Sequence, residues 1–304
     1  MAGGGKKAII AALAANLGIA IAKVVGFLIT GASSMLAEAI HSLADSGNQG
    51  LLLFGASRAE QAPDDEHHFG YARERYFWSF VVALVIFALG SLFAIYEGVH
   101  KILHPQPLSS PMVAVSILAV GLLLEGWSFF TAMKEAGKLR GNASWWQFIR
   151  KTKHAELPVV LLEDFGALIG LVLALVGVGL TTFTGNARFD ALSTLCIGIL
   201  LGLIAIFLAI EMKSLLIGES ASSKVIAFIK SEIQSTPSVQ CLIHLRTQHL
   251  GPEELLVAAK VSLAEDLDVK GVAETINLIE ARVREKIPSV RYLFIEPDLL
   301  RKEP

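Results

Sequence analysis

Long apolar runs alternate with short polar segments over the first two thirds of the chain, which has 304 residues. Each run is close to the roughly 20 residues that a helix needs to cross a hydrocarbon core about 30 Å thick. Backbone polar groups inside a bilayer must be satisfied within the protein, so the pattern predicts helices. We expect six membrane-spanning helices, at residues 8–30, 34–56, 77–98, 111–133, 158–181 and 190–216.

Composition supports a membrane protein and argues against other classes. Hydrophobic residues make up 53% of the chain and the mean hydropathy is +0.57. Charged residues make up only 18%, against about 25% in a typical soluble domain. The formal net charge of -2 and the lack of a basic arm argue against a nucleic-acid partner. No A-x-A cleavage pattern follows the first run, so we interpret it as a helix and not as a signal peptide.

Lysine and arginine gather on one side of the predicted helices. Arg58, Arg73 and Arg75 follow the second run, whereas the opposite side has only Lys101 and Arg188. The positive-inside rule then places both termini in the cytoplasm. We expect a multi-pass protein of a bacterial inner membrane in this orientation. The other basic residues on the cytoplasmic side are Lys6, Lys7, Lys134, Lys138, Arg140, Arg150, Lys151 and Lys153.

The sequence after Gly218 has the composition of a soluble domain. We therefore divide the chain into an all-α six-helix transmembrane domain, residues 1–217, and a small α+β cytoplasmic domain, residues 218–304. The second domain carries no Gly-rich phosphate loop, G-x-S-x-G or H-E-x-x-H motif, and we expect it to regulate or dimerise. Its predicted elements are a helix after Ser222, strands at 239–247 and 255–262, a helix at 269–286 and a strand at 290–295.

The second apolar run carries three ionisable residues, Glu38, His41 and Asp45. Spacings of three and four residues place them on one face of a helix. Ionisable groups inside a membrane are costly and usually mark ion paths or proton relays. Imidazole nitrogen and carboxylate oxygen also suit zinc in tetrahedral geometry. The stripe therefore predicts half of a metal site. The alternative is that His41 and Asp45 only hydrogen-bond each other and help to hold helices together.

The fifth apolar run supplies two more acids, Glu163 and Asp164, and no basic residue beside them. Adjacent residues point about 100° apart on a helix, so we expect only one of the two to face the centre formed by His41 and Asp45. A cation is the natural counter-charge for such acids, and a pair of neutral buried acids is the alternative. We expect Lys23 and Glu125, in the first and fourth runs, to bridge helices or snorkel.

Two segments of the sequence resemble the cation diffusion facilitator family. The segment that contains His41 and Asp45 reads L-I-T-G-A-S-S-M-L-A-E-A-I-H-S-L-A-D-S-G-N-Q, and the family carries H-x-x-x-D or D-x-x-x-D there. The loop from His67 to Tyr76, H-H-F-G-Y-A-R-E-R-Y, is similar to the family's H-P-F-G-Y-G-R-x-R-Y. The resemblance implies a transport site at His41 and Asp45, and a metallochaperone-like C-terminal domain through which members form homodimers.

The fifth run departs from the family pattern. Asp164 matches the second position of the family's H-x-x-x-D or D-x-x-x-D, but Val160 stands at the first position and cannot bind metal. The fourth ligand must then come from Glu163, Glu38, Asn48 or water. The L-L-E-D sequence is similar to the subgroup that contains the mitochondrial zinc transporter, and this likeness implies a role for Glu163.

The loop after the second run forms a possible accessory site, because Asp64, His67 and His68 combine a carboxylate with two imidazoles. The alternative for these three residues is a solvated loop. In the C-terminal domain, His244 and His249 do not align with the family's metal-binding histidines, so a regulatory metal site is not expected there.

Together these patterns predict a secondary transporter that exports a divalent metal in exchange for protons, without a cofactor. His41 favours Zn²⁺, with Co²⁺, Fe²⁺, Cd²⁺ and Mn²⁺ as other candidates. We expect it to work by alternating access, as a homodimer in a lipid bilayer. Two alternatives remain: a membrane-embedded metal-dependent enzyme, and a metal sensor or scaffold that does not transport.

Overall fold

The computed structural model of the chain describes the backbone of residues 3–299 and the side chains from Leu17 onward. Lys6 and Lys7, which contributed to the predicted orientation, lie outside the described side chains. The chain forms two compact units, and each is described by itself. The first contains Met1–Arg58 and Glu74–Lys213, and the second contains Ala59–Arg73 and Ser214–Pro304.

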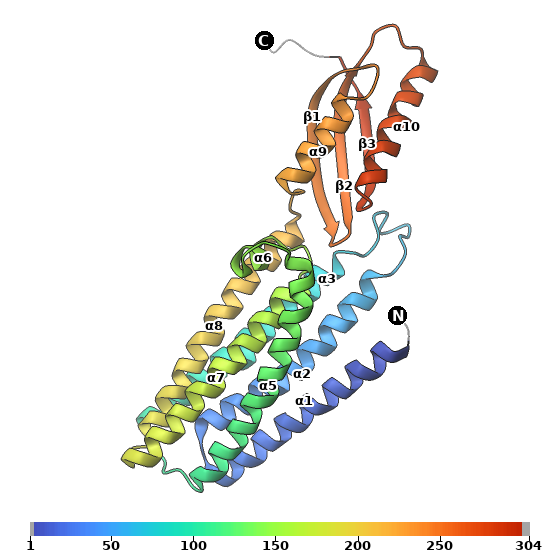
Figure 1. The fold of residues 1–304 in the computed structure, drawn as a ribbon. Helices are drawn as coiled ribbons and strands as arrows, with labels where there is room; N and C mark the ends of the chain where they lie inside the picture. Colours follow the sequence, from blue (N-terminus) through green and yellow to red (C-terminus); the bar gives the residue numbers. More distant parts are fainter. Residues whose placement is uncertain (1–2, 300–304) are drawn as a thin grey trace. The chain divides into compact units, whose positions relative to one another are not determined.

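Six long helical rods form the first unit, as the six apolar runs predict (Figure 1). The third rod is continuous but changes type, because α3 and α4 are joined by a π-helical segment, η1. A short helix, α6, was not predicted. The elements are α1 (Gly3–Thr30), α2 (Ser33–Ala59), α3 (Glu74–Val85), η1 (Ile86–Leu92), α4 (Phe93–Leu103), α5 (Pro111–Arg140), α6 (Trp145–Lys151), α7 (Glu156–Thr184) and α8 (Arg188–Ile217).

Four of these rods are long and apolar enough to cross a membrane by length and composition alone. They are Glu74–Leu103, Pro111–Arg140, Glu156–Thr184 and Arg188–Ile217. The described part of α1 adds a shorter apolar segment, Leu17–Thr30. The remaining rod, α2, is the one that carries the predicted stripe of polar residues. The helix that departs most from a membrane composition is therefore the one with the candidate site.

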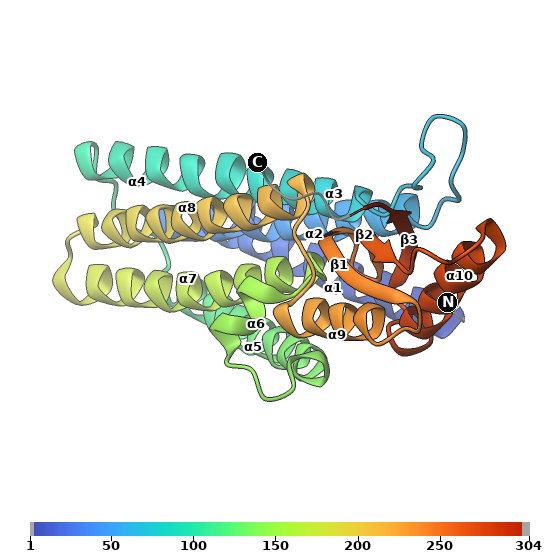
Figure 2. The ribbon, with the colours of Figure 1, turned by 90° about the horizontal axis from the view of Figure 1, so that it is seen from above.

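Close contacts between helices hold the first unit together. Both views show α7 between α5 and α8 (Figures 1 and 2). Between α4 and α8, a Cβ atom on Gly198 would lie 2.7 Å from the Ile95 backbone nitrogen, so only glycine fits there. Small residues that let backbones approach are typical of helix packing in membranes. The backbones of α4 and α8 are thus packed closely against each other.

The second unit has the predicted α-β-β-α-β order. Its strands lie in the order β1-β2-β3, with β1 antiparallel to β2 and β3 parallel to β2. Alternate residues of β2, such as Val257 and Val261, pack in one cluster with Ile229 and Ile279 from the two helices. Both helices therefore cover the same face of the sheet. The elements are α9 (Ser223–Gln234), β1 (Val239–Gly251), β2 (Glu254–Leu263), α10 (Val269–Lys286) and β3 (Val290–Pro297).

The loop after α2 belongs to the second unit, which the predicted boundary at residue 218 did not anticipate. Phe69 packs edge-on against Tyr292 of β3, with ring centroids 5.1 Å apart. A Cβ atom on Gly251 would overlap the side chain of Ala72, so the loop backbone and the β1–β2 turn are in close contact. Sequence order hides this grouping because the two segments are far apart along the chain.

Candidate metal centre

The polar stripe of α2 faces the interior of the first unit. His41 is 1% exposed, Asp45 is 9% exposed and Asn48 is fully buried. The Nδ1 atom of His41 lies 3.4 Å from Oδ1 of Asp45, one helical turn away. Burying polar groups in an apolar environment is unfavourable unless they find partners. The helix therefore holds these groups in the interior at an energetic cost.

Glu163 on α7 faces this stripe. Its Oε1 accepts a hydrogen bond of 2.8 Å from Nδ2 of Asn48, and its carboxyl group lies beside that of Asp45. Glu163 itself is 5% exposed. The structure therefore brings Glu163 together with two of the predicted α2 residues.

Asp164 points in a different direction from its neighbour. The hydroxyl of Ser128 on α5 donates a 3.2 Å hydrogen bond to Oδ2 of Asp164. The two adjacent acids thus diverge, as the turn of about 100° per residue requires. Glu163, and not the family-matching Asp164, is the acid that contacts Asp45.

A small cavity joins these groups. Its volume is about 10 Å³, close to the space that one water molecule needs. The valine at position 160 forms part of its wall, so the position where the family has a ligand is apolar here. Gln49 was not predicted, although it lies one turn beyond Asp45 on the same face. The lining residues are Ser42, Asp45, Gln49, Glu125, Val160, Glu163 and Asp164.

Several buried polar atoms on α2 have no hydrogen-bond partner. They include both ring nitrogens of His41, Oδ1 of Asp45, Oδ1 of Asn48 and Oε1 of Glu38. Nδ1 of His41 and Oδ1 of Asp45 are 3.4 Å apart, within ion-pair distance, but they do not form a hydrogen bond with each other. Such atoms are rare in folded proteins, and each requires an explanation. Imidazole nitrogens and carboxylate oxygens are also the atoms that bind divalent transition metals. A cation held beside α2 would satisfy them.

The predicted ligands are not gathered into one coordination sphere. Within the described part of the chain, no three His, Cys, Asp or Glu side chains lie close enough together to hold one ion. His41 lies toward η1, because a Cβ atom on Gly90 would be 4.0 Å from its Nδ1. Asp45 lies toward Glu163. Segments of π-helix inside α-helices often occur at functional sites, but the sequence around Gly90 gives no signal for one.

Glu38 lies toward α1 instead of toward α7. Lys23 of α1 donates to Oε2 of Glu38 at 3.2 Å and to the hydroxyl of Ser42 at 2.6 Å. The side chains of Lys23 and Glu38 are both fully buried. Lys23 therefore bridges two helices, and one oxygen of Glu38 is already engaged.

A larger cavity of about 360 Å³ adjoins the small one. Gln49 and Val160 line both cavities. The larger cavity also borders the ion pair between Arg75 and Glu156, whose Nη1 and Oε1 atoms are 3.3 Å apart. It lies along the part of α2 that leads to Ala56, near the C-terminal end of the helix. A cavity therefore lies next to Asp45 and Glu163, on the side toward the C-terminal end of α2.

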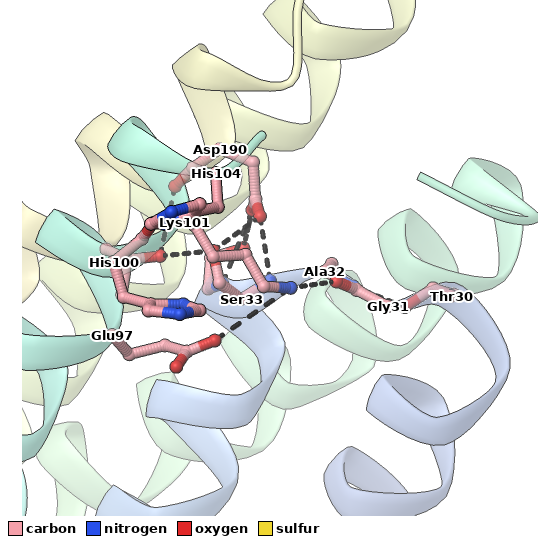
Figure 3. A network of polar contacts seen from close by, with 11 residues as sticks. Thr30, Gly31, Ala32, Ser33, Glu97, His100, Lys101, His104 and Asp190 are labelled. Atoms are coloured by element: carbon pink, nitrogen blue, oxygen red, sulfur yellow. Dashed lines mark hydrogen bonds and ion pairs between the residues drawn. The ribbon is translucent and has the colours of Figure 1, made fainter. Parts of the chain in front are cut away.

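The opposite end of α2 is held by a polar network (Figure 3). Asp190 of α8 accepts from the Ser33 backbone N–H at 2.7 Å and from its hydroxyl at 2.8 Å, and Ser34 also donates to it. Lys101 donates to the Gly31 carbonyl at 2.6 Å. Asp190 thus caps the N-terminus of α2 from another helix, where a negative charge also complements the helix dipole.

The predicted accessory residues lie in the second unit. Asp64 accepts hydrogen bonds from the Tyr71 hydroxyl at 2.6 Å and from the His67 backbone N–H at 2.7 Å. These bonds hold the pKa of the Asp64 carboxyl below its usual range. His67 and His68 are exposed and line a cavity of about 430 Å³ beside the β1–β2 turn. Asp64 therefore shapes the loop, and an accessory metal site at these residues stays a prediction.

Comparison with known families and proteins gives consistent matches. Residues 9–217 match the family described as the cation efflux transmembrane domain. The chain is 34% identical over 263 residues to the mitochondrial proton-coupled zinc antiporter SLC30A9 of Homo sapiens, a match that covers 85% of this chain and 45% of that protein. It is 24% identical over 257 residues to the zinc transporter ZitB of Pectobacterium atrosepticum, covering 83% of this chain and 74% of ZitB.

A solved structure also matches, the nickel form of a variant MamM C-terminal domain. The match has 20% sequence identity and a TM-score of 0.25, and it covers 26% of this chain and all of that domain. This chain spans about half the length of the SLC30A9 protein that it matches.

Proposed function

This chain belongs to the cation efflux family, and from that premise we propose that it exports a divalent transition-metal cation, first of all Zn²⁺, in exchange for protons. Membership of this family places the chain among membrane transporters and not among enzymes. The human relative is named as a zinc antiporter coupled to protons. We extend both the cation and the coupling to this chain as part of the proposal.

The observation that carries the proposal is the set of unpartnered buried atoms on α2 beside the carboxyl groups of α7. The ring nitrogens of His41 and Oδ1 of Asp45 have no hydrogen-bond partner, and Asp45 lies against Glu163. A doubly charged ion needs negative charge to leave water, and these acids supply it. We propose His41, Asp45, Glu163 and Asp164 as ligands of the transported ion. Asn48 and Glu38 are weaker candidates, and Co²⁺, Fe²⁺, Cd²⁺ and Mn²⁺ are the other cations to test.

Proton exchange follows from the chemistry of these ligands. Imidazole and carboxylate bind metal only when they are deprotonated, so metal binding releases protons and proton binding releases metal. We propose that the ion enters from the C-terminal end of α2, through the cavity that shares Gln49 and Val160 with the small cavity. The hydrogen bonds of Asp190 to Ser33 at the other end of that helix support a closed opposite side. Alternating access would open the end of α2 near Asp190 while the route at its C-terminal end closes.

We propose that the second unit forms the surface through which two copies of the chain dimerise. We propose that the first unit lies in a lipid bilayer. The human relative is named as mitochondrial. For this chain we still propose a bacterial inner membrane with both termini in the cytoplasm, on the basis of the distribution of lysine and arginine. Asp64, His67 and His68 remain a proposed accessory site.

Metal uptake into proteoliposomes under an imposed pH gradient tests the function. We expect the unmodified protein to carry Zn²⁺ at a rate that depends on the gradient, and Asp45→Asn to lower that rate at least about 100-fold, because the ion loses a full ligand charge. Asp266→Asn, a change of the same chemistry at an exposed position of the second unit, is the control and is expected to leave the rate unchanged.

The same experiment distinguishes the remaining alternative. If the unmodified protein moves none of the five cations, the transport proposal is wrong, and a sensor or scaffold becomes the better reading. A rate that does not respond to the pH gradient would leave the cation transport in place and remove the proton exchange.

A further inference from the structure

A lysine lies inside the first unit, close to the acids of the candidate site. Lys23 and Glu38 have no exposed side-chain surface, and their charged groups are 3.2 Å apart. The ammonium group also donates to Ser42, which lines the small cavity with Asp45. Lysine side chains in membrane proteins usually extend toward the water interface, whereas this one is held in the interior.

The surrounding helices are shaped to enclose the pair. A Cβ atom on Gly121 of α5 would lie 3.5 Å from Cε of Lys23, and a Cβ atom on Gly170 of α7 would overlap the Glu38 carboxylate. Four helices therefore surround the ion pair, and two of them approach it at glycines. The ion pair is therefore enclosed in the helix bundle and is not a contact at its surface.

The charge of Lys23 reaches the candidate ligands. It interacts electrostatically with Asp45, His41 and Glu125 as well as with Glu38. Charges in a buried environment are weakly screened, so a fixed positive charge there repels a second cation strongly. Lys23, and not Glu38, is the member of the pair whose charge acts on His41 and Asp45, so Glu38 offsets this repulsion only in part.

A purely structural role, in which the ion pair of Lys23 and Glu38 only holds α1 against α2, accounts poorly for its position. Buried ion pairs contribute little net stability compared with apolar residues of the same size. An apolar pair at these positions would hold the two helices at least as well, and it would not place a cation beside a cation site.

We propose that Lys23 is a resident cation that sets the affinity of the transport site, with Glu38 as its counter-ion and not as a metal ligand. The inference rests on the proposed function. A site built from several acids and an imidazole holds a divalent ion tightly, and a transporter must also release it. The fixed charge of Lys23 weakens the binding enough for release.

A charge cycle tests this role by Zn²⁺ titration of the full-length protein in nanodiscs. Lys23→Met is expected to tighten Zn²⁺ binding by about tenfold or more, and Glu38→Gln to weaken it by about as much. The double variant K23M/E38Q restores the net charge, so its dissociation constant is expected to lie within about threefold of the unmodified value. Lys23→Arg keeps the charge and serves as the matched control.

Each alternative has a different signature. If Glu38 is a ligand, the double variant binds as weakly as Glu38→Gln, and the proposal is wrong. If the pair has only a structural role, the variants change the thermal stability and leave the Zn²⁺ affinity unaltered, which also overturns it. Should Lys23→Met fail to fold, the double variant is compared with Glu38→Gln, and the same tightening is expected.

Failure of the proposed function looks different from failure of this inference. An unmodified protein that binds no Zn²⁺ contradicts the transport site itself. An unmodified protein that binds Zn²⁺, with variants that do not shift in opposite directions, contradicts only the role of Lys23. A slower transport turnover in Lys23→Met, together with tighter binding, would place the effect at metal release.

Discussion

The two units of this protein treat their polar groups in opposite ways. In the second unit, Glu232 is contacted by Arg282 at 2.9 Å and by Lys286 at 3.2 Å. In the first unit, His41 is 1% exposed and Asp45 is 9% exposed, close to the 8% of Glu232, yet both keep atoms without a hydrogen-bond partner. Among the residues that the structure describes, the buried unpartnered side-chain atoms all belong to the first unit.

This difference separates polar groups that stabilise the fold from polar groups that are free to bind a ligand. A satisfied polar group helps to fix one packing arrangement, whereas an unsatisfied one raises the energy of the folded chain. A protein retains such a cost where it serves function. The polar groups of the second unit therefore stabilise its fold, and the unpartnered groups of His41 and Asp45 are the ones that we propose to bind a cation.

The first expected effect that sharpens this comparison is on metal binding, and it separates the two adjacent acids on α7. We expect Glu163→Gln to weaken Zn²⁺ binding at least about tenfold, because Glu163 contacts both Asp45 and Asn48. Asp164→Asn is expected to have a smaller effect, because its carboxylate contacts Ser128. Titration of the two variants side by side checks the order.

The reverse order would be informative in its own right. It would mean that α7 turns by about 100° when metal binds, so that Asp164 takes the place of Glu163. Equal and negligible effects of both substitutions would contradict the assignment of α7 to the site.

The next effect concerns the stability of the second unit. Ile279 is fully buried in its core, and Ile279→Ala is expected to lower the free energy of unfolding of this unit by about 2 to 5 kcal/mol. Val269→Ala on the same helix is the control, because Val269 is 89% exposed and its substitution is expected to change stability by less than about 0.5 kcal/mol. Hydrogen exchange of the full-length protein measures both.

The same variant tests whether the two units are energetically separate. We expect the Zn²⁺ affinity of the folded Ile279→Ala protein to equal that of the unmodified protein. A parallel loss of affinity would break the comparison, because it would show that the binding site depends on the core of the second unit.

The smallest effect is a pH dependence. Hydrogen bonds from Lys286 and Arg282 hold the pKa of Glu232 below its ordinary value. A carboxyl group of this kind stabilises the fold above its unfolded pKa, and the contribution disappears as the pH falls through the lower folded pKa. Glu232→Gln is therefore expected to lower the melting temperature at pH 7 and to have no effect well below about pH 4. Glu265→Gln, at an exposed acid of the same unit, is the control, and a deficit that persists in acid would contradict the assignment.

The sequence predicts the elements of both units because their signals are local. Apolar runs mark the helices of the first unit, and a strand-like run at 255–262 marks β2, whose odd-numbered residues face Ile229 and Ile279. The stripe of His41 and Asp45 also follows from spacing on one helix. Each of these predictions needs only neighbouring residues and the repeat of a single element.

The arrangement within the site depends on contacts that spacing does not encode. Asp190 lies 157 residues from Ser33, whose backbone it caps. The rotation of α7 decides that Glu163 and not Asp164 contacts Asp45, and no local pattern fixes that rotation. The choice of Lys23 as the partner of Glu38 likewise depends on how α1 packs against α2.

The cap at Ser33 also gives α2 the geometry of a lever. A helix rises about 1.5 Å per residue, so His41 lies about 12 Å and Asp45 about 18 Å along the axis from the capped residue. If α2 tilts by 10° about its capped end, Asp45 moves by about 3 Å and His41 by about 2 Å, while Ser33 stays in place. A metal–oxygen bond is about 2 Å long. If Asp45 binds the cation as we propose, a small tilt of α2 about its capped end is enough to make or break that bond.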